Sequence, residues 1–478
     1  MPSTLILVLP NVLFITVDQW RGDCLGSLEH PVVQTPNLDA LAERGVMFSK
    51  HYAQCAPCGP SRASLHTGLY MHAHRSVDNG TPLDSRFTNM AIEVRELGYD
   101  PVLFGYTDTT LDPRTLAPGD PALTTYESVL PGYRTGVALP TEQEPWIGWL
   151  DDLGYDVSVG RTELHHPGGS IFGPPTYAAE HTDTAYMTDL VIDEIDRSDD
   201  GWFVHASYLR PHAPFVVAEP YHSMFDPADM PAPRRRPTSE EESAVHPIME
   251  GFVRAGLAVA DDPDSLARWQ AIYFAMMAEV DTQLGRLFEQ IDFDNTLVVV
   301  VSDHGEMLGD HWLQGKLGYY PESFHVPLII AGPGIESASQ PVSHFTENID
   351  LFPTIIDLIG GQIPSQCQGR SLRPFLEGSP PSGWRDAAHW EWDFRTTRPA
   401  DRDPEAFNLA VIHDDEGTYV HFAGERPLFF DLTDDPDHFV DRSRDPAWTD
   451  RTLDYAGRLL SWRMQTDFGE LVNINAIA

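Results

Sequence analysis

The stretch "NTLVVVVSDHGE" (Asn295–Glu306) decides the fold class. A continuous run of apolar residues, most of them β-branched, leads directly into Asp303 and His304, two residues that can bind a metal. An apolar run without alternation is typical of a strand that is buried on both faces, as in a parallel sheet. Ligands bind to such sheets outside the carboxyl ends of the strands. The stretch therefore predicts a buried strand that ends in a functional site.

Other strands and helices alternate with this one along the chain. "NVLFITV" (Asn11–Val17) predicts a second buried strand, which ends in Asp18. Further strands are predicted by "DPVLFGYT" (100–107), "GWFVHASY" (201–208) and "VPLIIAGPG" (326–334), and helices by "TPNLDALAERG" (35–45), "RASLHTGLY" (62–70, opening just after Pro60) and "WQAIYFAMMAEVDTQLGRLFEQI" (269–291). This alternation predicts an α/β fold with a central, mainly parallel sheet between layers of helices.

The pattern changes after residue 368, where the apolar runs become short and charges mix with aromatic residues. We expect a catalytic domain over residues 1–368, with a loop-rich insertion at 113–184 where Gly and Pro are frequent. A smaller C-terminal α+β domain should cover residues 369–478. It should hold an antiparallel sheet, a final helix from about Asp450 and a tail.

The charge balance excludes some kinds of partner. The chain has 31 basic and 72 acidic residues, a net charge of −41, which disfavours nucleic acid and anionic membranes as partners. No apolar run is long enough to span a membrane. Leu5–Val17 lacks the flanks of a secretion signal, and 4 cysteines in 478 residues argue against a disulfide framework. We therefore expect a cytoplasmic protein.

Two of the cysteines, Cys55 and Cys58, lie three residues apart in "QCAPCGPSR" (54–62). A zinc knuckle would need a second pair of cysteines, which the sequence lacks. A redox pair normally opens a helix directly after a strand, whereas here Pro60 and Arg62 crowd that position. Two half-buried thiols without a function are a further alternative. Cys58, Pro60 and Arg62 also form the pattern C-x-P-x-R, which is rare by chance in this composition, whereas Cys55 does not fit it.

This pattern carries a family resemblance. "CGPSRASLHTG" (58–68) resembles the sulfatase signature, and "TPNLDALAERGVMFSKHY" (35–52), "SDHGEMLGDH" (302–311) and "NIDLFPTIIDLIG" (348–360) extend the likeness over most of the chain. The sequence thus resembles the sulfatases of the alkaline phosphatase superfamily, which implies their fold. It is most similar to the branch of phosphonate monoester hydrolases and arylsulfatases in "ITVDQWRGD" (15–23), "HRSVDNGTPLD" (74–84), "DPVLFGYTDT" (100–109) and "SYLRPHAPF" (207–215).

The resemblance implies a cofactor and a nucleophile. Cys58 would be oxidised to formylglycine by a dedicated machinery, and the hydrated aldehyde would attack the sulfur or phosphorus of a small anionic ester. One divalent metal would be held by Asp18, Asp303, His304 and the modified Cys58. Ordinary sulfatases tend to carry a second acid where this chain has Gln19, and often Asp-Asn where it has Asp303-His304. One carboxylate fewer and one imidazole more make the site softer, so we favour Mn²⁺ and keep Ca²⁺ as possible.

The resemblance also implies roles for further residues. Arg62 would stabilise the formylglycine, Asp303 would take a proton from the nucleophile, and His212 would be the general acid for the leaving oxygen. Lys316, one of only two lysines, would bind the oxygens of the transferred group or the leaving group. The expected substrate-binding residues are Gln19, Asn79, Tyr106 and one of the two threonines Thr107 and Thr109, between which the sequence does not decide.

Two other functions stay open at this point. A two-metal phosphatase or phosphomutase would keep the fold but needs a Ser or Thr nucleophile and a second ligand set, for which His205, His212, His311 and His344 are available. A binding protein with a decayed site is the non-catalytic alternative. The apolar end of the tail Asp467–Ala478 also suggests docking on a neighbouring subunit, so we expect a homo-oligomer, either a dimer or a tetramer.

Overall fold

A seven-stranded sheet forms the centre of the computed structural model, which describes residues 9–140, 142–255, 257–259, 261–394, 406 and 408–467. The strand order is β2-β8-β7-β1-β6-β4-β5. The strands are β1 (Asn11–Val17), β2 (Val46–Met47), β4 (Val102–Gly105), β5 (Arg134–Ala138), β6 (Phe203–Tyr208), β7 (Thr296–Ser302) and β8 (Leu328–Ala331). The five strands from β7 to β5 run parallel, and β8 is antiparallel to β7. The predicted mainly parallel sheet is thereby confirmed.

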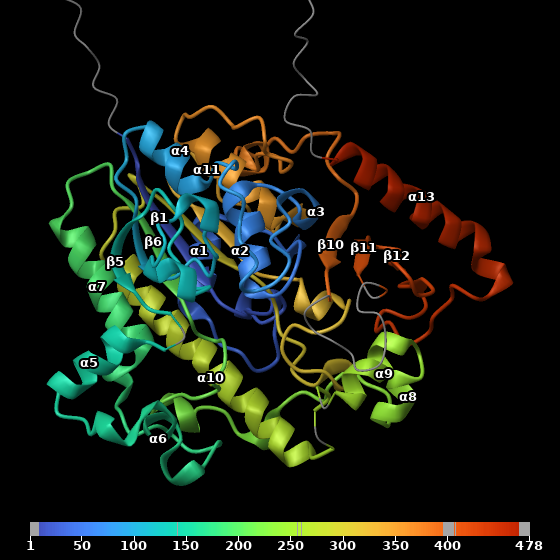
Figure 1. Ribbon diagram of the computed structural model, residues 1–478, viewed down its shortest axis with the longest axis horizontal. Helices are drawn as coiled ribbons and strands as arrows, with labels where there is room; N and C mark the ends of the chain where they lie inside the picture. The colour runs from blue at the N-terminus through green and yellow to red at the C-terminus, as the bar shows by residue number, and fades with distance from the viewer. Residues whose placement is uncertain are drawn as a thin grey trace, which may run out of the picture.

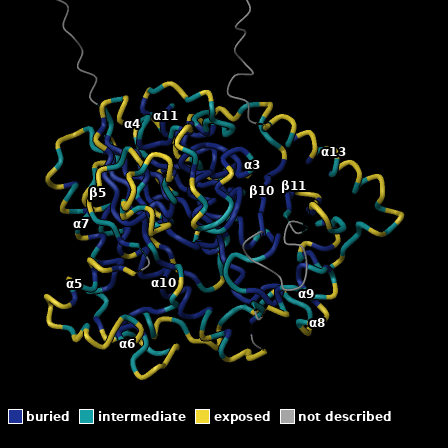
Figure 2. Tube along the Cα trace, viewed as in Figure 1, coloured by how far each residue is buried: buried dark blue, intermediate teal, exposed yellow. Residues whose placement is uncertain are grey.

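Helices cover both faces of this sheet (Figure 1). On one face lie α1 (Pro36–Arg44), α7 (Asp183–Arg197) and α10 (Pro263–Phe288), and on the other α2 (Cys58–Thr67), α4 (Met90–Glu96) and α11 (Leu351–Leu358). Side chains alternate along β1: Leu13 and Ile15 pack with the first group, and Phe14 packs with the second. Because both faces are covered, β1 and β7 are buried along their whole length (Figure 2).

The segment 113–184 contains more regular secondary structure than the expected loop-rich insertion. It contributes β5, an edge strand that pairs in parallel with β4. It also contains α5 (Glu144–Asp152) and α6 (Arg161–His165). Trp146 and Leu150 of α5 are fully buried in the core cluster that holds α7 and α10. This segment is therefore part of the central α/β architecture.

A second, smaller sheet follows near the C-terminus, as predicted. It is antiparallel, in the order β10 (Ala388–Trp392), β11 (Leu409–His413), β12 (Gly417–Phe422) and β13 (Leu428–Asp431). Helix α13 (Thr449–Gln465) packs on it through Tyr455, Leu459 and Trp462. Residues Phe468–Ala478, most of the tail that we expect to dock on a neighbour, lie outside the described residues.

Several further elements are short. They are the small parallel pair β3 (His51–Tyr52) and β9 (Thr346–Glu347), and the helices α3 (Met71–His74), α8 (Ser239–Ser243), α9 (Pro247–Arg254) and α12 (Arg373–Leu376). Tyr319 and Phe324 pack with Trp390 of β10 in one apolar cluster, so the small sheet shares a core with the part of the chain before residue 368.

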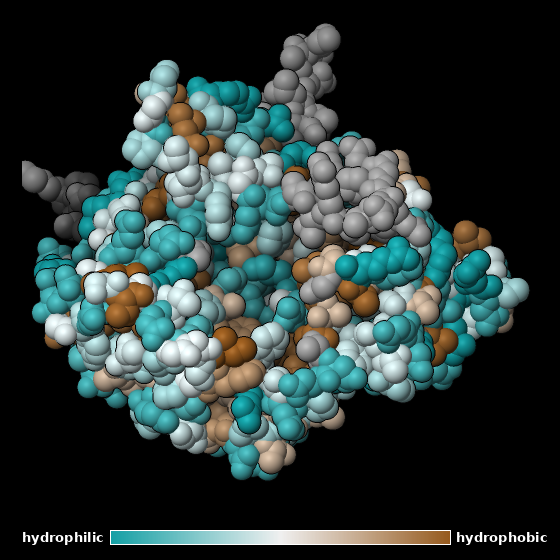
Figure 3. Space-filling view, turned by 60° about the horizontal axis from the view of Figure 1, so that its bottom comes forward, coloured by the Kyte–Doolittle hydropathy of each residue, from teal (hydrophilic) through white to brown (hydrophobic). Residues whose placement is uncertain are grey.

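The surface of the protein is mainly hydrophilic on the face shown in Figure 3. Hydrophilic residues cover most of the face in Figure 3, and apolar residues occur there in scattered groups. Within the part of the chain that the structure describes, every helix is too short or too polar to cross a membrane.

Candidate active site

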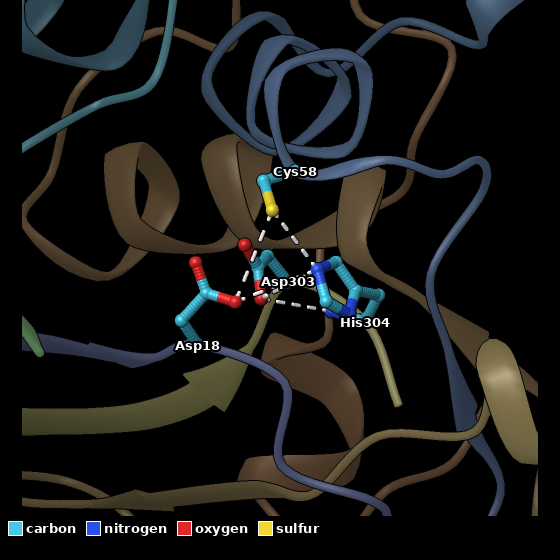
Figure 4. Close-up of side chains that lie close together, drawn as sticks. All are labelled: Asp18, Cys58, Asp303 and His304. Atoms are coloured by element: carbon cyan, nitrogen blue, oxygen red, sulfur yellow. Dashed lines mark hydrogen bonds and ion pairs between the residues drawn. The ribbon is translucent and has the colours of Figure 1, made fainter. Parts of the chain in front are cut away.

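Two neighbouring strands and one helix bring four predicted metal ligands together. β1 and β7 pair with Val17 opposite Ser302, so Asp18 and Asp303 leave the sheet side by side, and His304 follows. The helix α2 begins at Cys58, four residues before the predicted stretch 62–70, with Pro60 in its first turn. Cys58 therefore sits at the N-terminus of α2 and points at the ends of the two strands (Figure 4).

The donor atoms of Asp18, Cys58, Asp303 and His304 all lie within 4.8 Å of one another, and the four residues are buried. His304 Nε2 is 3.1 Å from Cys58 Sγ and 3.4 Å from Asp18 Oδ1. The other ring nitrogen, Nδ1, is 3.0 Å from the carbonyl oxygen of Gly305. Because a carbonyl only accepts, Nδ1 carries the proton and the Nε2 lone pair faces the cluster. Two carboxylates and an imidazole converging in this way fit one divalent cation.

Arg62 fixes both carboxylates. Its Nε donates to Asp303 Oδ2 at 2.9 Å and its Nη2 donates to Asp18 Oδ2 at 3.1 Å, which leaves the two Oδ1 atoms nearest His304 Nε2. Its Nη1 donates to the Tyr106 carbonyl at 3.0 Å and to Ser207 Oγ at 2.6 Å. Burial opposes the ionisation of Asp18, but nearby positive groups, Arg62 among them, outweigh it and hold the pKa of this carboxyl well below its usual range. The carboxylates are thus preorganised for a cation.

Lys316 contacts both Cys58 and His212. Lys316 Nζ is 2.9 Å from Cys58 Sγ and 3.2 Å from His212 Nε2, whereas Lys50, the other lysine, pairs with Asp415 at the surface. His212 Nδ1 donates to the carbonyl of Ala213, so its Nε2 accepts from Lys316.

The same contacts decide which of the two holds the proton. Burial and the charge of Lys316 lower the pKa of His212. Burial also opposes the charge on Lys316, but Cys58 and Asp18 outweigh it and raise the pKa of the lysine. In the structure the proton at this position therefore belongs to Lys316, and His212 is neutral before substrate binds.

Three of the expected substrate-binding residues support the site through other groups. The Tyr106 hydroxyl donates to Asp18 Oδ2 at 2.5 Å. Asn79 Oδ1 accepts from the backbone N–H of Gly59 at 2.9 Å, beside the nucleophile position. Gln19 Nε2 donates to Glu306 Oε2 at 2.5 Å. Each of these polar atoms thus already has a partner within the protein.

The two expected threonines use their hydroxyls on the backbone. Thr107 Oγ1 donates to the carbonyl of Ser128 at 2.6 Å, and Thr109 Oγ1 donates to the carbonyl of Thr107 at 2.9 Å. Neither hydroxyl is thus directed at the cluster, which differs from the expectation that one of them faces in.

Asp108, which lies between these threonines, was not among the predicted site residues. It has a φ of 48°, is 4% exposed, and its Oδ1 has no hydrogen-bond partner among the described residues. Burial raises the pKa of this carboxyl well above its usual range, although the charge of Arg62 opposes the shift. The only sequence feature that marks it is an acid close to the end of a strand.

The residues of the alternative second metal site do not converge. His205 bonds to Thr16 Oγ1 inside the sheet, His311 bonds to Glu242, and His344 packs against Phe375. Among the described residues, the cluster at Asp18 is the one group of three or more acidic, Cys or His side chains that could hold a metal. The described part of the chain therefore offers one candidate metal site.

Known proteins match this architecture along most of the chain. The family model for sulfatases matches residues 10–361. The chain belongs to the sulfatase family. The resemblance inferred from the sequence is thereby confirmed, and with it the assignment as a hydrolase. A second family model, for the C-terminal region of N-sulphoglucosamine sulphohydrolase, matches residues 309–465 of this sulfatase-family chain.

Three relatives illustrate the range of this family. The multifunctional alkaline phosphatase superfamily protein PehA of Trinickia caryophylli is 40% identical over 95% of both chains. The crystal structure of a phosphonate monoester hydrolase of Agrobacterium radiobacter is 44% identical, covers 96% of each chain and superimposes with a TM-score of 0.91. An arylsulfatase of Clostridium perfringens is 27% identical over 94% of this chain and 93% of its own.

Proposed function

We propose that this sulfatase-family protein hydrolyses sulfate monoesters, phosphonate monoesters and phosphodiesters at the cluster of Asp18, Cys58, Asp303 and His304. The observation that carries the proposal is the position of Cys58. It lies at the N-terminus of α2, 3.1 Å from His304 Nε2 and 2.9 Å from Lys316 Nζ, where a nucleophile would be flanked by a metal and a cation. The similarity to an arylsulfatase and to a phosphonate monoester hydrolase supports both substrate classes.

Two cofactors belong to the proposal. Formylglycine made from Cys58 would supply the nucleophile, and its formation needs an oxidant and a modifying enzyme from outside the chain. A divalent cation held by the cluster would supply positive charge that acidifies the nucleophile and polarises the ester. The imidazole of His304, and the amide at Gln19 in place of a second acid, favour Mn²⁺ over Ca²⁺.

The other residues act on the substrate and on the leaving group. Arg62 orients Asp18 and Asp303 through its two contacts of 3.1 and 2.9 Å. The ammonium group of Lys316 is placed to bind the non-bridging oxygens of a monoanionic ester. His212, in contact with Lys316, would first take up a proton from solvent at Nε2 once the ester anion raises its proton affinity, and would then pass that proton to the leaving oxygen.

The test is a comparison of kcat/KM on three esters that share one aryl leaving group: a sulfate monoester, a phosphonate monoester and a phosphodiester. We expect turnover of all three and loss of all three in Cys58→Ala. Cys55→Ala is the matched control, because Cys55 is equally buried but bonds to Ser64 on the helix. Activity that survives in Cys58→Ala, or about two metal ions per chain instead of one, would overturn the proposal.

A further inference from the structure

One buried carboxylate outside the metal cluster joins two segments of the site. Glu306 is 1% exposed, and its Oε2 accepts from Gln19 Nε2 at 2.5 Å. Its Oε1 accepts from the backbone N–H of Leu308 at 2.9 Å and from that of Gly315 at 2.6 Å. Glu306 therefore ties the residue after Asp18 to the base of the loop that presents Lys316.

The first contact orients Gln19. Its backbone is held on both sides, because its N–H donates to Asp303 Oδ1 and its carbonyl accepts from the Tyr273 hydroxyl. Only the side-chain amide remains to be fixed. A carboxylate can only accept, so the amide nitrogen of Gln19 must face Glu306, and its oxygen is the atom left for other groups. The positions of the amide nitrogen and oxygen of Gln19 are therefore fixed by the hydrogen bond to Glu306.

The second contact places Lys316. Gly315 has a φ of +65°, its N–H donates to Glu306, and its carbonyl accepts from the N–H of Met307 at 2.8 Å. These two bonds close the loop directly before Lys316, whose Nζ reaches Cys58 Sγ at 2.9 Å. A loop tip without such an anchor would leave the long lysine side chain many alternative positions.

Glu306 is itself firmly positioned. Its N–H donates to the carbonyl of Glu322 at 3.0 Å, and the N–H of Gly305 donates to that of Ser323 at 2.8 Å. A Cβ at residue 305 would lie 2.0 Å from the carbonyl oxygen of Glu322, so the backbone approaches closer here than any other residue type allows. The carboxylate thus acts from a rigid base.

We propose that Glu306 is a positioning residue that sets Lys316 and Gln19 jointly for the reaction at Cys58. It does not touch the reacting atoms, so its effect must run through these two side chains. The kinetic part of this inference rests on the proposed function, whereas the position of Lys316 can be measured without any substrate.

A double-mutant cycle tests the coupling. We expect Glu306→Ala to lower kcat/KM about 10- to 100-fold in the wild-type background, as is usual for a residue that supports active-site groups. In a Lys316→Ala background the same change should cost clearly less, about threefold, because only Gln19 of the two groups that it positions is still present. Glu306→Gln, which keeps an acceptor for both backbone N–H groups, should recover most of the loss. Equal losses in both backgrounds would show a merely structural role and overturn the inference.

The scarcity of lysine gives a second measurement that needs no turnover. Acetic anhydride labels amines, and peptide mass spectrometry can follow Lys316 with Lys50 as the internal reference. We expect Glu306→Ala to raise the labelling of Lys316 relative to Lys50, and the exposed control Glu241→Ala to leave it unchanged. An unchanged ratio in a folded Glu306→Ala protein would overturn the inference even if the wild type cleaves none of the esters. If Glu306→Ala does not fold, both measurements are made on Glu306→Asp, which shortens the side chain by one methylene group, with Lys316→Ala as the second site for the kinetics. Equal kinetic losses in both backgrounds, or unchanged labelling of Lys316, would then overturn the inference.

Discussion

The hydroxyl of Tyr106 offers a clean perturbation of the metal cluster. It donates to Asp18 Oδ2 at 2.5 Å, while the ring lies 4.3 Å from the Arg62 guanidinium and the backbone carbonyl accepts from Arg62. Tyr106→Phe removes only the first of these contacts, because the ring and the carbonyl remain. The variant therefore tests the hydrogen bond to Asp18 alone, without disturbing the contacts of Tyr106 with Arg62.

The magnitude follows from the type of bond. A hydrogen bond to a charged group contributes about 1.5–3 kcal/mol. At about 1.4 kcal/mol per tenfold change, its loss should weaken metal binding about 10- to 150-fold. With metal in saturating excess, we expect kcat/KM to recover to within a few-fold of the wild type, since the hydroxyl donates to Asp18 and acts through the metal site.

The assay is activity as a function of free Mn²⁺ in a metal buffer, with metal bound per chain measured in parallel. Tyr133→Phe is the matched control, because its buried hydroxyl has no hydrogen-bond partner among the described residues and its removal should change neither quantity. If Tyr106→Phe leaves the metal affinity unchanged but raises the KM of the ester, the hydroxyl binds substrate as the sequence suggested, and our interpretation of the contact with Asp18 is wrong.

Three further predictions concern other residues around the site. His212→Asn should lower kcat/KM about 10²- to 10⁴-fold for esters of alkyl alcohols and far less for nitrophenyl esters, whose leaving groups need no proton; equal losses for both would exclude a general acid here. Thr107→Val should reduce the free energy of unfolding by about 1–3 kcal/mol, because it leaves backbone groups of Ser128 and Leu130 unpaired, and a changed KM with unchanged stability would contradict this structural role. Burial raises the pKa of Asp108. Above the ordinary pKa of an aspartate, the unfolded chain loses this proton while the folded protein keeps it, so the free energy of unfolding should fall as the pH rises. Asp108→Asn should flatten this fall in thermal midpoints measured across pH, and a slope as steep as in the wild type would refute the assignment.

The sheet and its metal ligands could be predicted because their sequence pattern is strong. β1 and β7 are buried along their whole length, so their sequences are continuously apolar and each ends in an acid. Parallel strands bring such ends to the same edge of the sheet. The proximity of Asp18 and Asp303 could therefore be predicted without knowing how the two strands are aligned. Lys316 stood out because lysine is so rare in this chain.

Other features have no comparable pattern in the sequence. β5 is an edge strand whose first three residues are exposed, so it lacks the apolar run that marks a buried strand. The orientation of Thr107 and Thr109 depends on the left-handed backbone at Asp108, which interrupts the alternation of side chains. The role of Glu306 depends on contacts with residues far along the chain at Gln19, which only the folded structure brings together.

The chemical state of residue 58 tests the central claim most directly. The protein is expressed in a host that makes formylglycine, and the peptide that contains residue 58 is analysed by mass spectrometry beside a kinetic assay of the same sample. We predict that sulfur is replaced by oxygen with the loss of two hydrogens, and that ester turnover rises in proportion to the modified fraction. Full activity in a sample whose Cys58 is an unmodified thiol would contradict the account.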